Sequence, residues 1–359
     1  MIDIPQHLPG KLQADLVKAL PRLLPSLTLT RAGARRRLGS AATSLAVDVV
    51  TPLGRKRRLC VDARMAAAPS RIREAARQLR SELAKPSSGY PVLASTFLSP
   101  RAREICREEG VGYLDLAGNC YLRFDDLYLE KVVEKNPFPR RGRPPSLFSP
   151  ISSRIARALL EEPERAWTVS GLAQATGVSL GQASNVCRRL RDEEYVGTRR
   201  RRLRLTQPAR LLDAWQTHAP PADAAWRACY SFEREPERLL GRVARIGRQR
   251  RGGAGRYAVT SFGAASLVAP FVRGVGTLQW YVDEESAIER WVRALDLRPA
   301  ETGANVLLRV PHDSGVFYRA RTVHGVTLVG NIQLYLDLSH DAGRGQEQAA
   351  FLRQQKLGF

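Results

Sequence analysis

The pattern of apolar and polar positions over residues 168–205 predicts two helices, a tight turn between them and a short strand hairpin. In the second helix, apolar residues recur every three or four positions, the spacing of one buried helix face. These residues are Ala183, Val186, Cys187 and Leu190. Ser179 is placed to cap this helix by accepting a hydrogen bond from a free backbone N–H group of the first turn. We therefore expect two helices that pack together around a small core, with the turn at residues 177–179.

The opposite face of the second helix is polar, and the hairpin tip is basic. Amide side chains pair with base edges and Arg pairs with guanine or phosphate, as in a winged helix-turn-helix whose second helix reads the major groove. Four consecutive arginines in a hairpin are unfavourable unless an anion neutralises them. The candidate DNA-binding residues here are Ser179, Gly181, Gln182, Ser184, Asn185, Arg188, Arg189, Arg199, Arg200, Arg201, Arg202 and Arg204. The alternative interpretation is a protein-docking module with a solvated basic loop.

Helices flank this motif and complete a predicted DNA-binding domain over residues 150–219. The first has an inward face of Ile151, Ile155, Ala158 and Leu159, and the second covers residues 206–218. A stretch rich in Pro and Arg, residues 136–149, precedes the domain and predicts a linker. Its Arg140, Arg141 and Arg143 resemble an arm that enters the minor groove, and a plain basic linker is an equally good interpretation.

Residues 1–135 alternate between helix and strand patterns, which predicts an α/β domain with a partly parallel sheet. A helix over residues 8–24 carries Leu12, Leu16, Leu20 and Leu23 on one face. A basic segment, residues 31–39, comes before the first predicted strand. A hairpin over residues 45–65 is then followed by alternating helices and strands, at residues 69–83, 90–96, 99–110, 111–118, 120–124 and 127–133.

This order of elements over about residues 10–135 resembles the core of the PD-(D/E)XK nuclease superfamily. In that family an acid on one strand and an (Asp/Glu)-x-Lys on the next hold a metal ion and orient the attacking water. The matching positions are Asp48 and, on the next strand, Asp62, Ala63 and Arg64. Because Arg64 replaces Lys and keeps its proton near neutral pH, the resemblance implies a restriction-endonuclease-like fold without catalysis.

Two alternatives exist for the acids. Both could bind a hard cation through oxygen, which would make the protein a metal-dependent DNA nuclease targeted by the winged helix. Asp48 and Asp62 could also be ordinary solvent-facing members of alternating strands.

The remaining residues, 222–359, again mix helix and strand patterns and predict a third, C-terminal α/β domain. Its clearest elements are a helix over residues 235–249, a strand that enters a helix over residues 255–271, and a hairpin that turns at His324 and Gly325. A helix over residues 331–340 follows this hairpin.

The winged helix, the segment GRYAVTSFGAASLVAPF and the closing GVTLVGNIQLYLDLSHDAGRGQEQAAFL together resemble the AbiEi-type antitoxins of type IV toxin–antitoxin systems. The resemblance covers about residues 146–359. It implies a bacterial DNA-binding repressor of its own operon whose C-terminal domain neutralises a nucleotidyltransferase-like toxin. In those antitoxins the winged helix lies near the N-terminus, whereas about 145 residues precede it here.

The C-terminal domain itself distantly resembles a nucleotidyltransferase fold, with SFGAAS at the position of a Gly-Ser phosphate loop. Such an enzyme needs paired acids to hold metal ions. Asp283, Glu284 and Glu285 follow the next strand instead of alternating along it, so we expect no catalysis in this domain.

Charge and composition agree with a nucleic-acid partner. The 359 residues carry a formal net charge of +22, which favours polyanions over acidic small molecules. The five cysteines have no metal-ligand spacing, which suits a reducing cytoplasm, and the N-terminus lacks a signal-peptide pattern. We expect a cytoplasmic, nucleoid-associated regulator that binds double-stranded DNA as a possible homodimer. We expect no membrane span, cofactor, metal ion or enzymatic activity.

Overall fold

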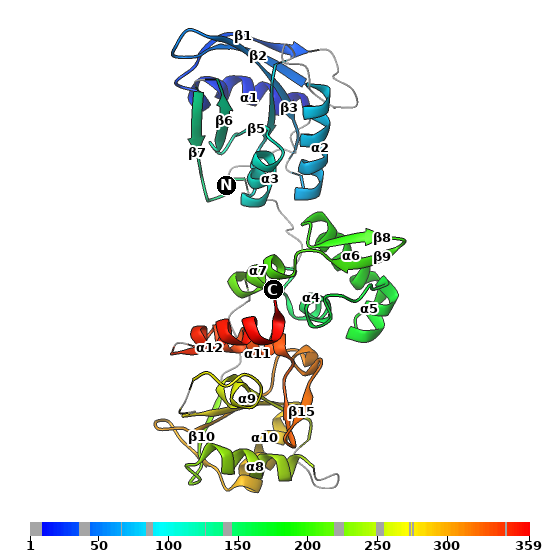
Figure 1. Cartoon of the computed structure of the whole chain (residues 1–359), viewed down its shortest axis with the longest axis vertical. Coiled ribbons are helices and arrows are strands. Elements are labelled where there is room, and N and C mark those ends of the chain that lie inside the picture. Colours follow the sequence, from blue (N-terminus) through cyan, green and yellow to red (C-terminus); the bar gives the residue numbers. More distant parts are fainter. Residues whose placement is uncertain are drawn as a thin grey trace. The chain divides into compact units, whose positions relative to one another are not determined.

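Figure 1 shows the protein as a computed structural model in which helices and strands alternate along the chain. The chain divides into two compact units: residues 1–144 with 192–194, and residues 145–191 with 195–359. The mixed α/β class predicted from the sequence is confirmed. The structure describes residues 9–35, 44–65, 67–83, 89–125, 127–138, 146–218, 226–248, 255–272, 274, 276–341 and 343–359. Among these residues, no helix has both the length and the apolar character needed to span a membrane.

The first unit is built on a seven-stranded sheet in which strands adjacent in the sequence are also adjacent in space. Strand β3 pairs in parallel with β4, and β4 with β5, while the other neighbours are antiparallel. The elements are α1 (Pro9–Leu23), β1 (Thr28–Arg35), β2 (Ser44–Val50), β3 (Lys56–Ala63), α2 (Pro69–Glu82), β4 (Tyr90–Ser95), α3 (Pro100–Glu108), β5 (Gly112–Asp115), β6 (Cys120–Phe124) and β7 (Leu127–Lys131).

Separate cores lie on the two faces of this sheet. Helix α1 packs on one face through the predicted leucine stripe, whose members Leu12, Leu16, Leu20 and Leu23 are all buried. Helices α2 and α3 pack on the other face, where Cys60 and Leu93 of the sheet meet Ile72 and Ile105 of the helices. The alternation of residues along β2 and β3 therefore decides which core each side chain joins.

One strand of this unit differs from the prediction. Residues 31–39 were expected to form a basic segment before the first strand, but strand β1 covers Thr28–Arg35 and pairs with β2 along its whole length. Strand β1 lies at the edge of the sheet, and edge strands commonly carry charged residues that discourage further pairing. Residues 36–39 of the predicted segment lie outside the described residues. Basic composition was therefore a misleading sign of irregular structure.

The second unit begins with a central region, residues 146–218. It contains α4 (Pro150–Glu161), α5 (Val169–Thr176), α6 (Leu180–Asp192), the antiparallel pair β8 (Val196–Arg199) and β9 (Arg202–Leu205), and α7 (Pro208–His218). The predicted inward face of α4 is confirmed for Ile155, Ala158 and Leu159, which are buried. Ile151 is 44% exposed, so its predicted inward position was wrong; it lies in the first turn of α4.

The C-terminal region, residues 226–359, contains a mixed seven-stranded sheet in the order β13-β10-β14-β12-β11-β16-β15. Its elements are β10 (Arg227–Tyr230), α8 (Pro236–Gly247), β11 (Tyr257–Thr260), α9 (Ser261–Val268), β12 (Leu278–Val282), α10 (Glu285–Leu295), β13 (Arg298–Pro299), β14 (Val306–Arg309), η2 (Ser314–Phe317), β15 (Arg321–Val323), β16 (Val326–Leu328), α11 (Asn331–Ser339), α12 (Gly345–Leu352) and η3 (Arg353–Leu357). The predicted turn at His324 and Gly325 is confirmed, because both residues have positive φ angles between β15 and β16.

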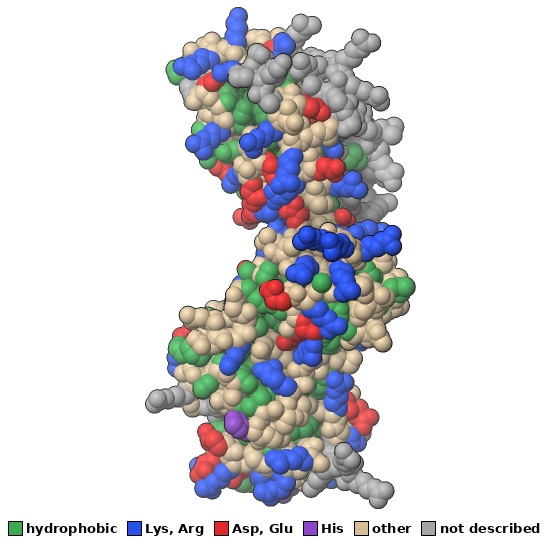
Figure 2. Space-filling view, turned by 45° about the vertical axis from the view of Figure 1, so that its right-hand side comes forward, with side chains coloured by type: hydrophobic (Ala, Val, Ile, Leu, Met, Phe, Trp, Pro, Cys, Tyr) green, Lys and Arg blue, Asp and Glu red, His purple; other side chains and the backbone are tan. Residues whose placement is uncertain are grey.

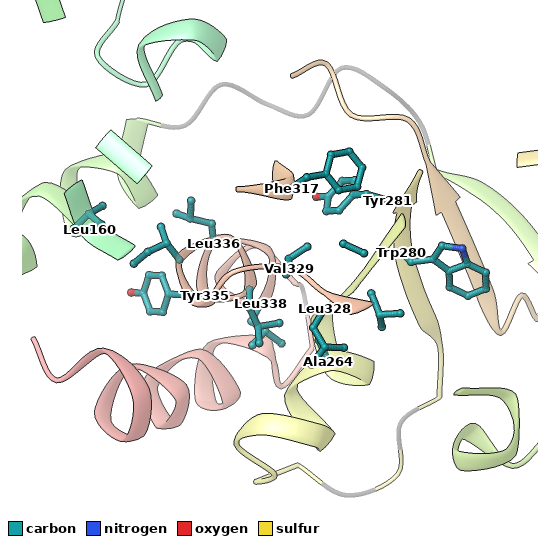
Figure 3. Close-up of a cluster of buried hydrophobic side chains, with 14 of the residues drawn as sticks. Leu160, Ala264, Trp280, Tyr281, Phe317, Leu328, Val329, Tyr335, Leu336 and Leu338 are labelled. Carbon is teal, nitrogen blue, oxygen red and sulfur yellow. The ribbon is translucent and has the colours of Figure 1, made fainter. Parts of the chain in front are cut away.

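The central and C-terminal regions share one hydrophobic core. Figure 3 shows Leu160 of α4 beside Tyr335 and Leu336 of α11, and these residues are buried together. The core then continues through Val329 and Leu328 to the sheet. These two regions, which the sequence pattern separated at Pro220 and Pro221, thus pack as a single compact unit.

Candidate nucleic-acid interface

Helices α5 and α6 are joined by the turn that the sequence predicted. The Thr168 side chain caps the start of α5 by accepting a hydrogen bond from the Gly171 backbone N–H at 3.0 Å. Gly177 ends this helix with φ of +64°, a left-handed conformation that glycine adopts without steric cost. Val178 then turns into the core, where it is buried. The turn is therefore fixed at both ends before α6 begins.

Ser179 caps α6, as predicted. Its hydroxyl oxygen accepts a hydrogen bond from the Gln182 backbone N–H at 3.3 Å, and the hydroxyl lies 3.0 Å from the Gln182 side-chain oxygen. Ala183, Val186, Cys187 and Leu190 form the buried face, again as predicted. Packing of this face against the rest of the central region sets which residues of α6 point outward.

The outward face of α6 carries most of the predicted contact residues. Gly181, Gln182, Ser184, Asn185 and Arg188 are exposed, and Arg189 is half-buried. An Arg188 guanidinium nitrogen donates a hydrogen bond to the Asn185 side-chain oxygen at 3.1 Å. The structure thus brings an amide and a guanidinium group together on one open helix face. Both are groups that can hydrogen-bond base edges.

The hairpin formed by β8 and β9 turns through only two residues, Arg200 and Arg201. Their φ angles are +50° and +61°, as in the two-residue turns that favour Asn-Gly. Arg has a Cβ atom that disfavours this conformation, at a cost of about 1 kcal/mol or more per residue. Two arginines therefore occupy a turn that other residues would form more stably.

The arginines of this hairpin are open to an external partner. All five, Arg199, Arg200, Arg201, Arg202 and Arg204, are exposed. No acidic side chain among the described residues forms a salt bridge with them. Figure 2 shows Lys and Arg side chains gathered on the central region. The base of the hairpin is anchored, because the backbones of Trp167 and Leu203 exchange hydrogen bonds of 2.8 and 2.7 Å.

The linker arginines Arg140, Arg141 and Arg143 lie outside the described residues, so their predicted role as a minor-groove arm stays a prediction.

The acids of the nuclease comparison lie apart. Asp48 on β2 pairs in register with Arg58 of β3, whereas Asp62 on β3 pairs with Ser44 of β2. Four residues along a strand span about 13 Å, and metal ligands lie within about 2.6 Å of their ion. The structure therefore does not bring Asp48 and Asp62 together. Within the described parts of the chain, no group of three His, Cys, Asp or Glu side chains could hold a metal ion.

Each of these acids has an arginine partner instead. Arg58 donates two hydrogen bonds to the Asp48 carboxylate, at 2.6 and 3.0 Å. Asp62 is 2% exposed and accepts one from Arg64 at 2.8 Å. Burial raises the pKa of the Asp62 carboxyl, and the Arg64 guanidinium opposes that rise. Asp48 is thus a half-exposed strand residue, while Asp62 is buried, contrary to the interpretation of both as solvent-facing.

The proposed phosphate-loop segment of the C-terminal region is helical. Ser261–Val268 forms helix α9, and Ser261, Gly263, Ala264 and Ala265 within it are buried. The acids Asp283 and Glu284 follow the end of β12, as the sequence indicated, and Glu284 forms a salt bridge with Arg290. The segment is therefore a partly buried helix, whereas Asp283, Glu284 and Glu285 are exposed.

A polar contact between the central and C-terminal regions was not predicted. Arg157 of α4 is 5% exposed, donates a hydrogen bond to the Gln333 side chain at 2.6 Å, and lies 4.9 Å from the centre of the Trp215 ring. Gln333 in turn donates to Asp337 at 2.6 Å. Burial raises the pKa of the Asp337 carboxyl, although Thr260, Tyr281 and Gln333 all donate hydrogen bonds to it.

Glu161 of α4 makes a second such contact, at the start of α11. Its carboxylate accepts a hydrogen bond from the Ile332 backbone N–H at 2.8 Å. A Cβ atom at Gly330 would lie 2.3 Å from the same oxygen and 2.9 Å from the Tyr318 backbone oxygen, so glycine best fits this close approach. Helix α4 therefore caps α11 from another part of the chain.

A comparison with protein families gives a match that includes the C-terminal region. Residues 204–358 match the family model described as "Transcriptional regulator, AbiEi antitoxin, Type IV TA system". The match begins within β9, so helices α4, α5 and α6 lie outside it. No curated protein and no solved structure matches the chain. The resemblance inferred from the sequence is confirmed over the matched residues: this part of the chain is similar to the AbiEi antitoxin family of transcriptional regulators of type IV toxin–antitoxin systems.

Proposed function

We propose that the protein is a sequence-specific, non-enzymatic DNA-binding regulator of the AbiEi antitoxin type. The central region acts as a winged helix-turn-helix, with α6 as the recognition helix and the β8–β9 hairpin as the wing. The observation that carries this proposal is the open α6 face of Gln182, Asn185 and Arg188, followed in the chain by a hairpin whose arginines have no acidic partner among the described residues.

Helix α6 suits the major groove of double-stranded DNA. Asn and Gln amides pair with adenine, and the Arg fork pairs with guanine. The helix is held rigidly by its buried face and by the Ser179 cap, so these groups are presented in a fixed arrangement. A rigid reading face lowers the entropy lost on binding.

The wing supports affinity more than sequence reading. Arg200 and Arg201 stand at the end of a two-residue turn with positive φ angles, where they can reach phosphates or the minor groove. The strain of that turn is offset if the two charges meet phosphate groups. A wing built only for stability would carry Asn-Gly there.

The C-terminal region is the proposed binding site for a toxin or other protein partner, since the matching family consists of antitoxins. Binding to a palindromic operator would require a homodimer. A regulator of this kind acts on the bacterial nucleoid in the cytoplasm.

The N-terminal unit is proposed to be a nuclease-like domain without catalysis. Arg64 occupies the position of the catalytic Lys and is engaged by Asp62 at 2.8 Å. The separation of Asp48 from Asp62 in register weighs further against the alternative of a metal-dependent nuclease.

The test is competition binding by the full-length protein. Duplexes covering the DNA upstream of its own gene compete against scrambled duplexes of the same length. We expect at least one upstream duplex to bind about 1000-fold more tightly than its scrambled form. Equal affinity for both would overturn the proposal of a sequence-specific regulator.

A further inference from the structure

Leu180 is an apolar side chain in the first turn of α6 that the protein leaves uncovered. It is 59% exposed. A single exposed leucine is ordinary on a protein surface, but this one stands on the helix that we propose reads DNA. Its exposed neighbours on this side of the helix are the polar residues Ser184 and Arg188, four and eight positions later. An apolar protein surface would not match these groups, whereas the edge of a DNA duplex offers polar and apolar groups side by side.

Gly181, the next residue, is not required by the fold. A Cβ atom there would meet no other atom within 4 Å, and its φ angle lies outside the left-handed region. Glycine is one of the least favourable residues inside a helix. Gly181 also lies on the same line of the helix as Asn185 and Arg188, four and seven positions later. At Gly181, therefore, no side chain covers the backbone of α6 in the middle of its exposed face. Another molecule can approach the helix most closely there.

We propose that Leu180 reads a thymine by packing against its 5-methyl group, and that Gly181 lets this turn of α6 enter the major groove. The inference rests on the proposed function. The thymine methyl is the apolar feature of the major groove. A leucine on α6 therefore distinguishes thymine from cytosine in a way that the neighbouring amide and guanidinium groups do not.

The first test removes the methyl group from the DNA. The probe is a duplex that the full-length wild-type protein enriches from a random-sequence library, with one thymine at a time replaced by deoxyuridine. We expect one replacement to weaken wild-type binding about fourfold, the factor that burial of one methyl group gives. Leu180→Ala should bind the thymine and deoxyuridine duplexes equally. Leu180→Met, which keeps an apolar chain, should retain a preference for thymine.

Ile151 provides the matched control. It is an exposed apolar residue of the same region, 44% exposed, but lies on α4. Ile151→Ala should keep the full difference between thymine and deoxyuridine.

The second test adds a side chain at Gly181. Gly181→Ala places a methyl group in open space, so the thermal unfolding midpoint should stay the same or rise. Affinity for the enriched duplex should nevertheless fall about tenfold or more, because the added methyl occupies space that the duplex needs. Unchanged affinity in Gly181→Ala would contradict the role of Gly181.

The outcomes separate this inference from the proposed function. In one outcome, Asn185→Ala and Arg188→Ala lose specificity, but no replacement of thymine by deoxyuridine weakens binding, or the weakening persists in Leu180→Ala. The inference is then wrong and the proposed function stands. If the variants at Asn185 and Arg188 lose no specificity, α6 does not read DNA, and both this inference and the assignment of α6 as the recognition helix are wrong.

Discussion

The Arg157 guanidinium of α4 donates a hydrogen bond to the Gln333 side chain of α11 at 2.6 Å, in a site where Arg157 is 5% exposed. The two residues lie 176 positions apart in the chain. The bond therefore ties the proposed DNA-reading region to the region that matches the antitoxin family model. A buried charge of this kind is costly to leave without a partner.

Arg157→Ala should destabilise the protein by about 3 kcal/mol, because it breaks the buried contact and leaves a cavity beside Trp215. Arg157→Met should lose less, since an apolar side chain fills the same space without a charge. Urea denaturation measures both. The control is Arg238→Ala, which removes a surface pair with Glu235 and should change stability by about 0.5 kcal/mol or less. Equal losses in Arg157→Ala and the control would show that the contact is not stabilising.

Asp337 should make stability depend on pH. Burial raises the pKa of its carboxyl in the folded state above the unfolded value, so the folded protein binds this proton more tightly. The stabilisation is then fully present below the unfolded pKa and is lost as pH rises through the folded pKa. Asp337→Asn cannot titrate, so its stability relative to wild type should increase with pH and then level off. Urea denaturation of both proteins across pH 4–8 measures this, and a constant difference would contradict the prediction.

Asn185→Ala or Arg188→Ala should cost about 1–3 kcal/mol on the specific duplex and little on random DNA, since these side chains are proposed to contact base edges. Competition binding to cognate and scrambled duplexes measures the two losses. Gln354→Ala, which removes an exposed amide of the C-terminal region, should change neither. Equal losses on both duplexes would mean that specificity comes from another part of the chain.

Replacing Arg200 and Arg201 by Asn and Gly should stabilise the hairpin and weaken DNA binding. Asn-Gly adopts the observed turn with less strain, which should raise stability by about 1 kcal/mol. Loss of two phosphate contacts should weaken specific and random binding alike. It should also reduce the slope of log affinity against log salt concentration by about 1.8.

Arg298→Ala is the control for the salt measurement, because Arg298 is an exposed arginine on β13. It should leave the slope unchanged. A slope that also stays unchanged in the hairpin variant would argue against a wing that meets phosphates.

The N-terminal unit should not cleave DNA with Mg²⁺ or Mn²⁺. Arg64 cannot give up its proton near neutral pH, and Asp48 lies four residues out of register with Asp62. Plasmid incubated with the full-length protein and either metal ion should stay supercoiled. Nicking that disappears in Asp62→Ala would instead support the nuclease alternative.

The local features of the candidate interface could be predicted from the sequence, because they depend on residues close together in the chain. The turn at Gly177, the Ser179 cap and the buried stripe around Cys187 follow from helix periodicity and capping chemistry. The exposure of Asn185 and Arg188 follows from the same periodicity.

Features that depend on distant residues could not be predicted in this way. The register of β2 with β3 decides that Ser44, not Asp48, lies opposite Asp62, and a register is set by packing of the whole sheet. The contact of Arg157 with Gln333 leaves no periodic signal in either helix. The strain at Arg200 and Arg201 also needs backbone angles, since a basic tip alone does not reveal the turn type.

The contacts of helix α4 also limit where a gene fusion can join parts of this chain without losing them. Glu161 fits against Gly330 and caps α11, while Leu160 contributes to the core shared with Leu336. A gene fusion that exchanged residues 226–359 for a distant homologue would need to carry matching partners for Glu161 and Arg157. A crossover between α7 and β10 would therefore separate side chains that fit one another, whereas a crossover before α4 would keep them together. A transfer of residues 146–359 would keep these contacts of α4 with α11.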